Sequence, residues 1–369
     1  MAGFLIVFFA IYSLMHAFVY SRVVILLGPS ERVAAILFMA LMIFAPVGSR
    51  MLERSGSLRA ARACARAGYV WLGFIFYCFW GVLLVDTAGA LLRVANFVGG
   101  FSLPVFAGPA APICVLAAAA GINVYGYFEA RSVRVERLVL KSSKLPAGID
   151  RLRIAQISDV HLGLTAGPKR MERILRGIEA ERPDILVGTG DLIDGKLESS
   201  EAVAALFSRI RTRLGKFAVT GNHEVYAGLE KSIEALRAWG FTVLRGEARR
   251  VGDILNIVGV DDPAADSNGD EAKILESAQN ELFTLLLKHR PHPAGGSLGL
   301  FDLQLSGHTH YGQLFPFRYM VELSYPLQNG PYHLSKGSVL YVSRGSGSWG
   351  PPVRVLARPE VTIIEVERP

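Results

Sequence analysis

The first 21 residues set the strongest constraint on what this chain can fold into. Residues 3–21 are almost entirely apolar and contain no aspartate, glutamate, lysine or arginine. At about 1.5 Å per residue, a helix of this length crosses the roughly 30 Å hydrocarbon core of a bilayer. The segment lacks a basic start and further apolar segments follow it. We therefore interpret it as a membrane span and not as a cleaved signal peptide.

Three further apolar segments predict that residues 1–128 form a helical membrane region of about four spans. They cover residues 33–49, 68–85 and 105–127, and two prolines interrupt the last of them. Residues 86–104 are also mostly apolar, but they carry one acidic and one basic side chain. This composition favours a place in the membrane interface or a re-entrant segment.

The basic residues predict the orientation of the spans. Five arginines lie within residues 50–67, and five more basic residues lie between positions 131 and 144, whereas the two opposite loops hold only Arg32 and Arg93. The positive-inside rule then places both termini and the soluble domain in the cytoplasm of a multi-pass inner-membrane protein. The net charge of +7 is concentrated beside the apolar segments, which suits membrane lipids as partners. The sequence contains no stripe of arginine and aromatic side chains that would indicate a nucleic acid as partner. It does not specify an oligomeric state.

The rest of the chain has ordinary globular composition. We predict a linker with a leading strand at residues 129–150 and a soluble domain at residues 151–369. All three cysteines of the chain lie before this part, so no disulfide framework is expected in it. Apolar strands alternate with polar loops and helices, and strand-rich sequence follows. This order predicts an α/β fold in which two mixed sheets pack as a sandwich flanked by helices.

Side chains of the type that bind metals follow the predicted strands. Strand ends converge on one edge of such a sandwich, so we expect these side chains to lie together. Carboxylate, amide and imidazole ligands without cysteine suit Mn²⁺, Fe or Zn²⁺. The candidates are Asp159, His161, Asp191, Asn222, His289, His308 and His310.

The spacing of these residues favours two ions. Asp159 and His161 are two positions apart, so in an extended segment they share a face, and His308 and His310 have the same spacing. Asp191 has two carboxylate oxygens and can bridge ions about 3.5–4 Å apart. Two ions solve a specific problem, because a phosphoester is anionic and repels hydroxide. They lower the pKa of a water between them and neutralise the transition state, while a histidine outside the metal shell protonates the leaving oxygen.

The complete set of short motifs resembles the calcineurin-like metallophosphoesterase family. The motifs are Asp-x-His at 159–161, Gly-Asp at 190–191, Gly-Asn-His-Glu at 221–224, a later histidine at 289 and Gly-His-x-His at 307–310. The text around residues 157–163 and the ending Arg-Pro-Glu at 358–360 are similar to its membrane-anchored bacterial branch. The resemblance covers roughly residues 130–369.

The resemblance implies a division of labour among the ligands. Asp159, His161 and His310 would bind one ion, Asn222, His289 and His308 the other, and Asp191 would bridge them. It also implies that His223 acts as general acid or stabilises the transition state.

Several residues keep two interpretations. His289 is favoured over His292 as a ligand because it directly follows an apolar strand. Arg344 lies among glycines and is either a phosphate contact or a loop arginine paired with an acid. Asp194 either orients a ligand or is a solvated turn residue, and Glu224 either supports the site or is a helix-entry acid.

The sequence indicates the reaction better than the substrate. We expect hydrolysis of a phosphoester or pyrophosphate bond, and the membrane region favours a lipid-linked phosphate. The resemblance to members that cleave UDP-2,3-diacylglucosamine makes that molecule the leading candidate, and residues 311–319 would form an acyl-facing wall or part of the core. Two alternatives remain: a general phosphodiesterase or protein phosphatase that is merely anchored, and a non-enzymatic membrane or transport protein with a vestigial domain.

Overall fold

The computed structural model describes residues 2–102, 104, 108–197, 199–265 and 269–369. The chain divides into two compact units, each defined by the contacts within it. The first consists of residues 1–128 with 350–353, and the second of residues 129–349 with 354–369.

The first unit is helical. Its helices are α1 (Ala2–Val23), η1 (Val24–Leu26), α2 (Pro29–Arg54), α3 (Leu58–Gly99) and α4 (Ala110–Glu129). The four α-helices are each long and apolar enough to cross a membrane. Large apolar side chains on them face outward, including Leu14, Leu37 and Leu84. Such surfaces are stable when lipid covers them, which fits the predicted helical membrane region.

Helix α3 differs from the prediction. It continues through residues 86–99, where an interfacial or re-entrant segment was expected. Its 42 residues correspond to about 63 Å, roughly twice the thickness of a bilayer core. The acidic residue that suggested an interruption, Asp86, pairs with Arg22 of α1 at 2.9 Å. The pair offsets both charges, so the helix need not end there.

The first sheet of the second unit has six strands: β1 (Arg134–Lys141), β14 (Glu360–Glu367), β2 (Arg151–Ile157), β4 (Ile185–Thr189), β6 (Lys216–Val219) and β7 (Thr242–Val243), in this spatial order. Strands β2, β4, β6 and β7 run parallel, and β14 is antiparallel to β2. All five residues of β4 are buried, as is typical of a parallel strand covered on both faces. The predicted linker carries β1, which pairs with β14 along its whole length and so belongs to the sheet.

The second sheet also has six strands: β12 (Gly330–His333), β13 (Val339–Val342), β11 (Leu303–Ser306), β10 (Phe283–Lys288), β9 (Leu255–Val260) and β8 (Glu247–Val251), in this spatial order. The four inner strands are parallel, and both edge strands are antiparallel to their neighbours. A short pair, β3 (Leu162–Gly163) with β5 (Ile193–Asp194), lies outside both sheets.

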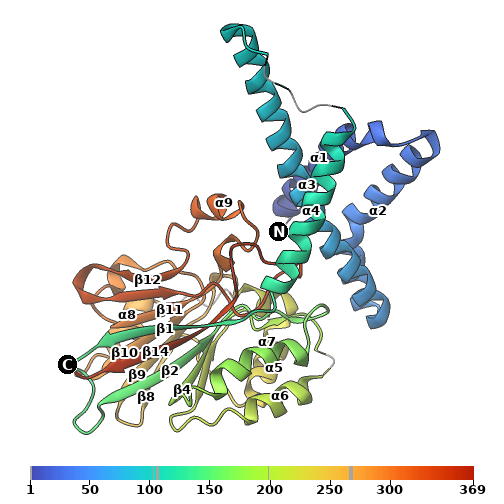
Figure 1. The fold of residues 1–369 in the computed structure, drawn as a ribbon. Coiled ribbons are helices and arrows are strands. Elements are labelled where there is room, and N and C mark those ends of the chain that lie inside the picture. The colour runs from blue at the N-terminus through green and yellow to red at the C-terminus, as the bar shows by residue number, and fades with distance from the viewer. Residues whose placement is uncertain (1, 103, 105–107, 198, 266–268) are drawn as a thin grey trace. The chain divides into compact units, whose positions relative to one another are not determined.

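Helices cover the outer faces of this sandwich. They are α5 (Pro168–Glu179), α6 (Ser200–Ser208), α7 (Asn222–Ala238), α8 (Glu271–Ser277) and α9 (Arg318–Glu322), with short 3-10 turns η2 (Pro263–Ala265), η3 (Gly295–Ser297), η4 (His310–Gly312) and η5 (Ser335–Gly337). Figure 1 shows α5, α6 and α7 together on one side of the first sheet. Helix α5 buries Met171, Ile174, Leu175 and Ile178, the spacing of one helical face.

Three clusters of buried apolar side chains hold the layers together. One fills the space between the first sheet and α5, α6 and α7. Another joins the facing sides of the two sheets, and a third lies under α8. The predicted α/β sandwich with flanking helices is therefore confirmed. Its parallel strands end at a common edge, where the loops that carry the ligand candidates begin.

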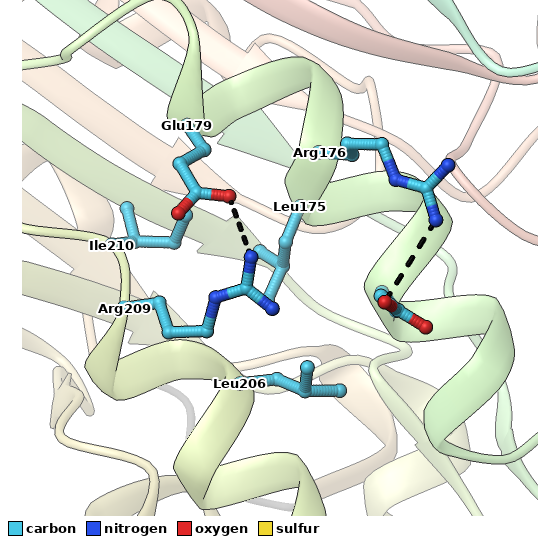
Figure 2. A pocket seen from close by; sticks show the side chains of 7 residues that line it. Leu175, Arg176, Glu179, Leu206, Arg209 and Ile210 are labelled. Atoms are coloured by element: carbon cyan, nitrogen blue, oxygen red, sulfur yellow. Dashed lines mark hydrogen bonds and ion pairs between the residues drawn. The ribbon is translucent and has the colours of Figure 1, made fainter.

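A shallow groove between α5 and α6 lies away from that edge. Figure 2 shows Leu175, Leu206 and Ile210 in it, with Arg209 paired to Glu179 at 3.0 Å. The Arg209–Glu179 pair links the two helices, and Arg176 pairs with Glu172 within α5 at 3.8 Å. These side chains belong to the contact between α5 and α6, and none of the ligand candidates lies in the groove.

Candidate metal centre

Three of the predicted ligands form the first cluster. Asp159, His161 and His310 present one ligand atom each, and these atoms lie within 4.8 Å of one another. The two imidazole Nε2 atoms are 3.0 Å apart, and His310 Nε2 is 3.4 Å from Asp159 Oδ1. Two nitrogens bound to one ion at about 2.1 Å and a right angle would be about 3 Å apart. The separation is therefore that of ligands of a single ion.

Asp191, His289 and His308 form the second cluster, again within 4.8 Å. His289 Nε2 lies 3.2 Å from Asp191 Oδ2 and 3.1 Å from His308 Nδ1. The opposite nitrogen of His289 donates to the Thr189 carbonyl at 2.8 Å, so Nε2 is the atom that faces the cluster. Asn222, the remaining predicted ligand, is buried with no hydrogen bond to Oδ1 among the described residues.

Asp191 connects the two clusters. Its Oδ2 atom lies 3.2 Å from His289 Nε2 and 3.9 Å from His161 Nε2, which belong to different clusters. Burial alone would raise the pKa of Asp191, but His289 and His223 hold it well below its usual range. The residue is thus an ionised carboxylate between two groups of ligands, which is the position of a bridge.

The composition of the clusters fits divalent cations. Burial and the neighbouring His223 lower the pKa of His161 to about 3, so its imidazole is neutral and has a lone pair to donate. Two carboxylates, Asp159 and Asp191, are almost fully buried beside these rings. Buried carboxylates and convergent imidazole nitrogens are costly to leave unpaired, and divalent ions satisfy both.

The backbone at the ligands is unusual. Five of the seven adopt positive φ angles, between 49° and 74°: Asp159, His161, Asp191, His308 and His310. Such conformations cost roughly 1–3 kcal/mol each and concentrate at functional sites. The strand-end loops turn sharply enough to aim each side chain inward, and packing of the sandwich holds them there.

Glycines in the motifs make room for the ligands. A Cβ atom on Gly221 would overlap Asp191 Oδ1, and one on Gly307 would overlap Ser158 Oγ and Asp159 Oδ2. Gly190 has φ of +88°, and a Cβ there would lie 2.6 Å from His289 Nδ1. The sequence predicts a sharp turn or a close backbone approach at each of these glycines. The structure shows which ligand or supporting atom makes the close approach.

We expect Gly307→Ala to lower metal content and activity together. The added methyl group displaces Asp159, and displaced ligands of this kind cost about 10- to 100-fold in metal affinity. Gly295→Ala is the matched control, because no atom lies within 4 Å of a Cβ at that position. Metal titration followed by mass spectrometry measures the effect. Equal metal affinity in the two variants would show that the Gly307 contact is unimportant.

His223 lies beside the clusters with its own partner. Its Nδ1 atom is 2.9 Å from Asp194 Oδ1, and its ring packs edge-on against His161 with centroids 4.6 Å apart. Burial lowers the pKa of His223, but Asp191 and Asp194 outweigh this and raise it to about 9. Of the two interpretations of Asp194, the structure supports the orienting role. Because Asp194 engages Nδ1, Nε2 of His223 is the atom that can give up a proton.

Glu224 supports the site from behind. It is fully buried, and its carboxylate accepts hydrogen bonds from the backbone N–H groups of Gly221, Asp191 and Ile193 at 2.8–2.9 Å. One side chain therefore joins the loop of Asp191 to the start of α7. The structure shows both interpretations of this residue, because the bond from the Gly221 N–H caps the start of α7 and the bonds from Asp191 and Ile193 support the site.

Replacing Glu224 with glutamine should destabilise the protein by about 1–3 kcal/mol, because an amide N–H₂ then faces a backbone donor. Metal affinity should fall as well, since the Asp191 loop loses its support. The exposed Glu234 on the same helix provides the control Glu234→Gln. Thermal unfolding with and without added Mn²⁺ measures both effects. An unchanged midpoint in Glu224→Gln would contradict the supporting role.

Two residues around the ligands escaped the sequence analysis. Arg354 is fully buried and donates to His310 Nδ1 at 2.9 Å and to three backbone carbonyls at 2.7–2.8 Å. Tyr325 places its hydroxyl 2.9 Å from His308 Nε2. Both lie 15 or more residues from the ligand they hold, outside every motif, so no local signal could have found them.

Two other candidates, and a histidine that lies outside every motif, are apart from the ligands. His292 stacks near Tyr325 with ring centroids 4.8 Å apart and belongs to neither cluster, and His333 is exposed on β12. The Arg344 guanidinium pairs with Glu360 and Glu136 at 2.5 Å each, which is the second of its two interpretations. Both sides of the Arg344 guanidinium are therefore engaged by carboxylates of the protein itself.

Comparisons with known proteins agree with this geometry. The sequence model of the calcineurin-like phosphoesterase family matches residues 152–312, which include all seven ligand candidates. An uncharacterized metallophosphoesterase of Aquifex aeolicus is 39% identical over 252 residues, covering 67% of this chain and 96% of that protein. The chain belongs to the calcineurin-like metallophosphoesterase family.

Relatives with membrane segments are part of this metallophosphoesterase family. A Danio rerio transmembrane protein with a metallophosphoesterase domain is 32% identical over 314 residues, covering 80% of this chain and 70% of that protein. An uncharacterized metallophosphoesterase of Bacillus subtilis, YkuE, is 30% identical over 270 residues, covering 68% and 92% respectively. With the family's ligand set intact, this chain is a metal-dependent phosphoesterase, and the vestigial alternative is excluded.

Proposed function

We propose that this enzyme hydrolyses a phosphoester or pyrophosphate bond of a lipid-linked substrate at the cytoplasmic surface of a bacterial inner membrane. The observation that carries the proposal is the joining of a two-cluster metal centre, bridged by Asp191, to four helices long enough to cross a membrane. An enzyme fixed in a membrane meets lipid-linked substrates at high effective concentration. UDP-2,3-diacylglucosamine is the specific candidate.

Two ions bound at this centre would supply Lewis acidity to the phosphate oxygens and a nucleophile derived from water. Asp159, His161 and His310 would hold one ion, and Asn222, His289 and His308 the other. Mn²⁺ is the expected metal, with Fe and Zn²⁺ as alternatives that the same ligands accept.

The remaining work falls to His223. Asp194 fixes its ring through Nδ1, and the carboxylates of Asp191 and Asp194 favour its protonated form. His223 can therefore donate its Nε2 proton to the leaving oxygen as the phosphorus–oxygen bond breaks. This proton neutralises the departing alkoxide or phosphate, and because Asp194 already fixes His223, no side chain has to move to deliver it.

The substrate is tested with the full-length protein purified in detergent and supplied with Mn²⁺. We expect hydrolysis of UDP-2,3-diacylglucosamine at a higher kcat/KM than of a soluble model phosphodiester or a phosphomonoester. Activity confined to the soluble diester, or to phosphopeptides, would instead support the anchored phosphodiesterase or protein phosphatase. The same assay with Mn²⁺, Fe²⁺ and Zn²⁺ in turn identifies the most active metal.

The cytoplasmic location is tested separately. Arginines lie at the end of α2 and the start of α3, and arginines and lysines follow α4, the distribution from which the positive-inside rule predicts a cytoplasmic domain. A green fluorescent protein fused to the C-terminus should fluoresce, because it folds in the cytoplasm and not after export in an unfolded state. A dark fusion that is present at normal levels would place the domain on the opposite side.

A further inference from the structure

An apolar surface lies beside the metal centre on the segment that follows the ligand His310. Among the described residues of the second unit, eight large hydrophobic side chains are exposed, and half of them fall within seven consecutive positions. They are Phe317, Tyr319, Met320 and Leu323, with exposed fractions of 46%, 53%, 56% and 79%. We call these four side chains the α9 face.

The α9 face is held rigidly. The Arg318 guanidinium lies 4.8–5.6 Å from the ring centroids of Tyr311, Phe315 and Tyr319 and donates to the Tyr319 hydroxyl at 2.9 Å. A Cβ on Gly312 would overlap the Arg318 backbone, so the chain folds back tightly on itself there. Exposed apolar side chains do not stabilise a loop that faces only water. A set of them held in place in this way indicates an interaction surface.

The surface continues toward the metal centre. Backbone hydrogen bonds of Gln313 and Phe315 with Val355 bring the exposed Leu356 alongside the same segment. The Gln313 side chain bonds both the N–H and the carbonyl of Trp349 at 2.8–2.9 Å. The half-exposed Trp349 ring in turn contacts the His223 ring, with centroids 5.8 Å apart.

We infer that the α9 face docks on the surface of the lipid bilayer. Aromatic rings, aliphatic side chains and an arginine are the residues that insert into the boundary between headgroups and acyl chains. The chain itself supplies the membrane, because only four residues separate the end of α4 at Glu129 from the start of β1 at Arg134. The five steps from Glu129 to Arg134 extend at most about 18 Å, so the second unit stays tethered close to the end of a membrane helix. Weak apolar contacts suffice at such a high effective concentration.

This inference deepens the proposed function and rests on it for its purpose. A bilayer docked against the α9 face adjoins Trp349 and His223, so a phosphoester headgroup can reach the ligands while its acyl chains stay in lipid. Tyr325, two residues after Leu323, binds His308 directly. The α9 face is thus connected through Tyr325 to His308, one of the predicted metal ligands.

The experiment uses the full chain with its three cysteines replaced by serine and a single new cysteine, Leu323→Cys, carrying a polarity-sensitive fluorophore. The matched control is Asp253→Cys, on the turn between β8 and β9, whose side chain is 83% exposed. Both are placed in nanodiscs of phosphatidylcholine and phosphatidylglycerol at 3:1. We expect a blue-shifted emission and quenching by doxyl-labelled lipid at position 323 and neither effect at position 253.

Two outcomes would overturn the inference. One is a probe at position 323 that is as exposed to water as the control. The other is a blue-shifted probe that doxyl lipid does not quench, because protein then covers the face, either the apolar helices of this chain or a second copy. Neither readout requires activity, so a failed substrate assay leaves it interpretable.

A kinetic variant separates docking from catalysis. Met320→Asp combined with Leu323→Asp changes only exposed side chains. It should lower the rate on a phosphoester lipid in vesicles at least about 10-fold and leave the rate on a soluble model diester unchanged. An equal loss on both substrates, or no loss on either, would contradict docking.

Discussion

Asp191→Asn is expected to abolish activity, with kcat/KM lower by roughly 10²–10³-fold or more and with less than two metal ions bound per chain. The substitution preserves size and still lets Oδ1 accept from the His223 backbone N–H. It replaces the oxygen that faces His289 and His161 with an amide nitrogen, which has no lone pair to donate. The change therefore removes the bridge with little disturbance of the fold.

The decisive comparison is metal content against stability. Asp253→Asn makes the same chemical change at an exposed turn and should behave like the natural protein in both respects. Metal stoichiometry by mass spectrometry, thermal unfolding and hydrolysis of a model diester are measured on the two variants in parallel. Two ions and a normal rate in Asp191→Asn would falsify the bridging role.

The sequence predicted the sandwich and the convergence of the ligand candidates because both depend on local patterns. Short apolar runs ending in Asp-x-His, Gly-Asp or Gly-His-x-His place ligands at strand ends, and parallel strands end at a common edge. Gly190, Gly221 and Gly307 mark the same positions. The structure adds the reason, since each glycine makes space for a ligand or its support from a different motif.

What the sequence did not predict depends on contacts between distant residues. A leading strand was predicted within residues 129–150, but its partner was not, because β1 pairs with β14 more than 200 residues away and so makes this stretch part of the first sheet. Arg354 and Tyr325 hold His310 and His308 across 44 and 17 residues. Neither residue type is rare or specific enough to be recognised without the fold.

The predicted end of the third span at residue 85 was wrong for a different reason, since α3 continues to Gly99. An acidic residue within an apolar run usually marks a break, because an isolated charge is costly in lipid. Arg22 lies 64 residues away in the sequence and pairs with Asp86 at 2.9 Å, so the charge of Asp86 is not isolated. Charge pairs between helices therefore limit how well span boundaries can be predicted from hydropathy alone.

Replacing His223 with asparagine should lower kcat by about 10²–10⁴-fold while two ions remain bound. His223 belongs to neither of the two clusters that Asp191 connects, although with His161 and Asp194 it forms a third group of close ligand atoms. If His223 is a proton donor and not a ligand, metal content should match that of the natural protein. The loss should depend on the leaving group. A substrate that releases an alkoxide needs the proton and should suffer most, whereas one that releases a nitrophenolate, a weaker base, should suffer least.

The pH profile provides the sharper test, because the two roles of His223 predict opposite results. As a general acid it must be protonated, so kcat falls as pH rises through its pKa. Asp191 and Asp194 raise that pKa to about 9, and bound cations would lower it again, so the alkaline limb should lie below pH 9. His223→Asn should lack this limb, while His333→Asn, at an exposed position on β12, should keep it. An alkaline limb that persists in His223→Asn, with equal losses for both leaving groups, would mean that His223 stabilises charge without transferring a proton.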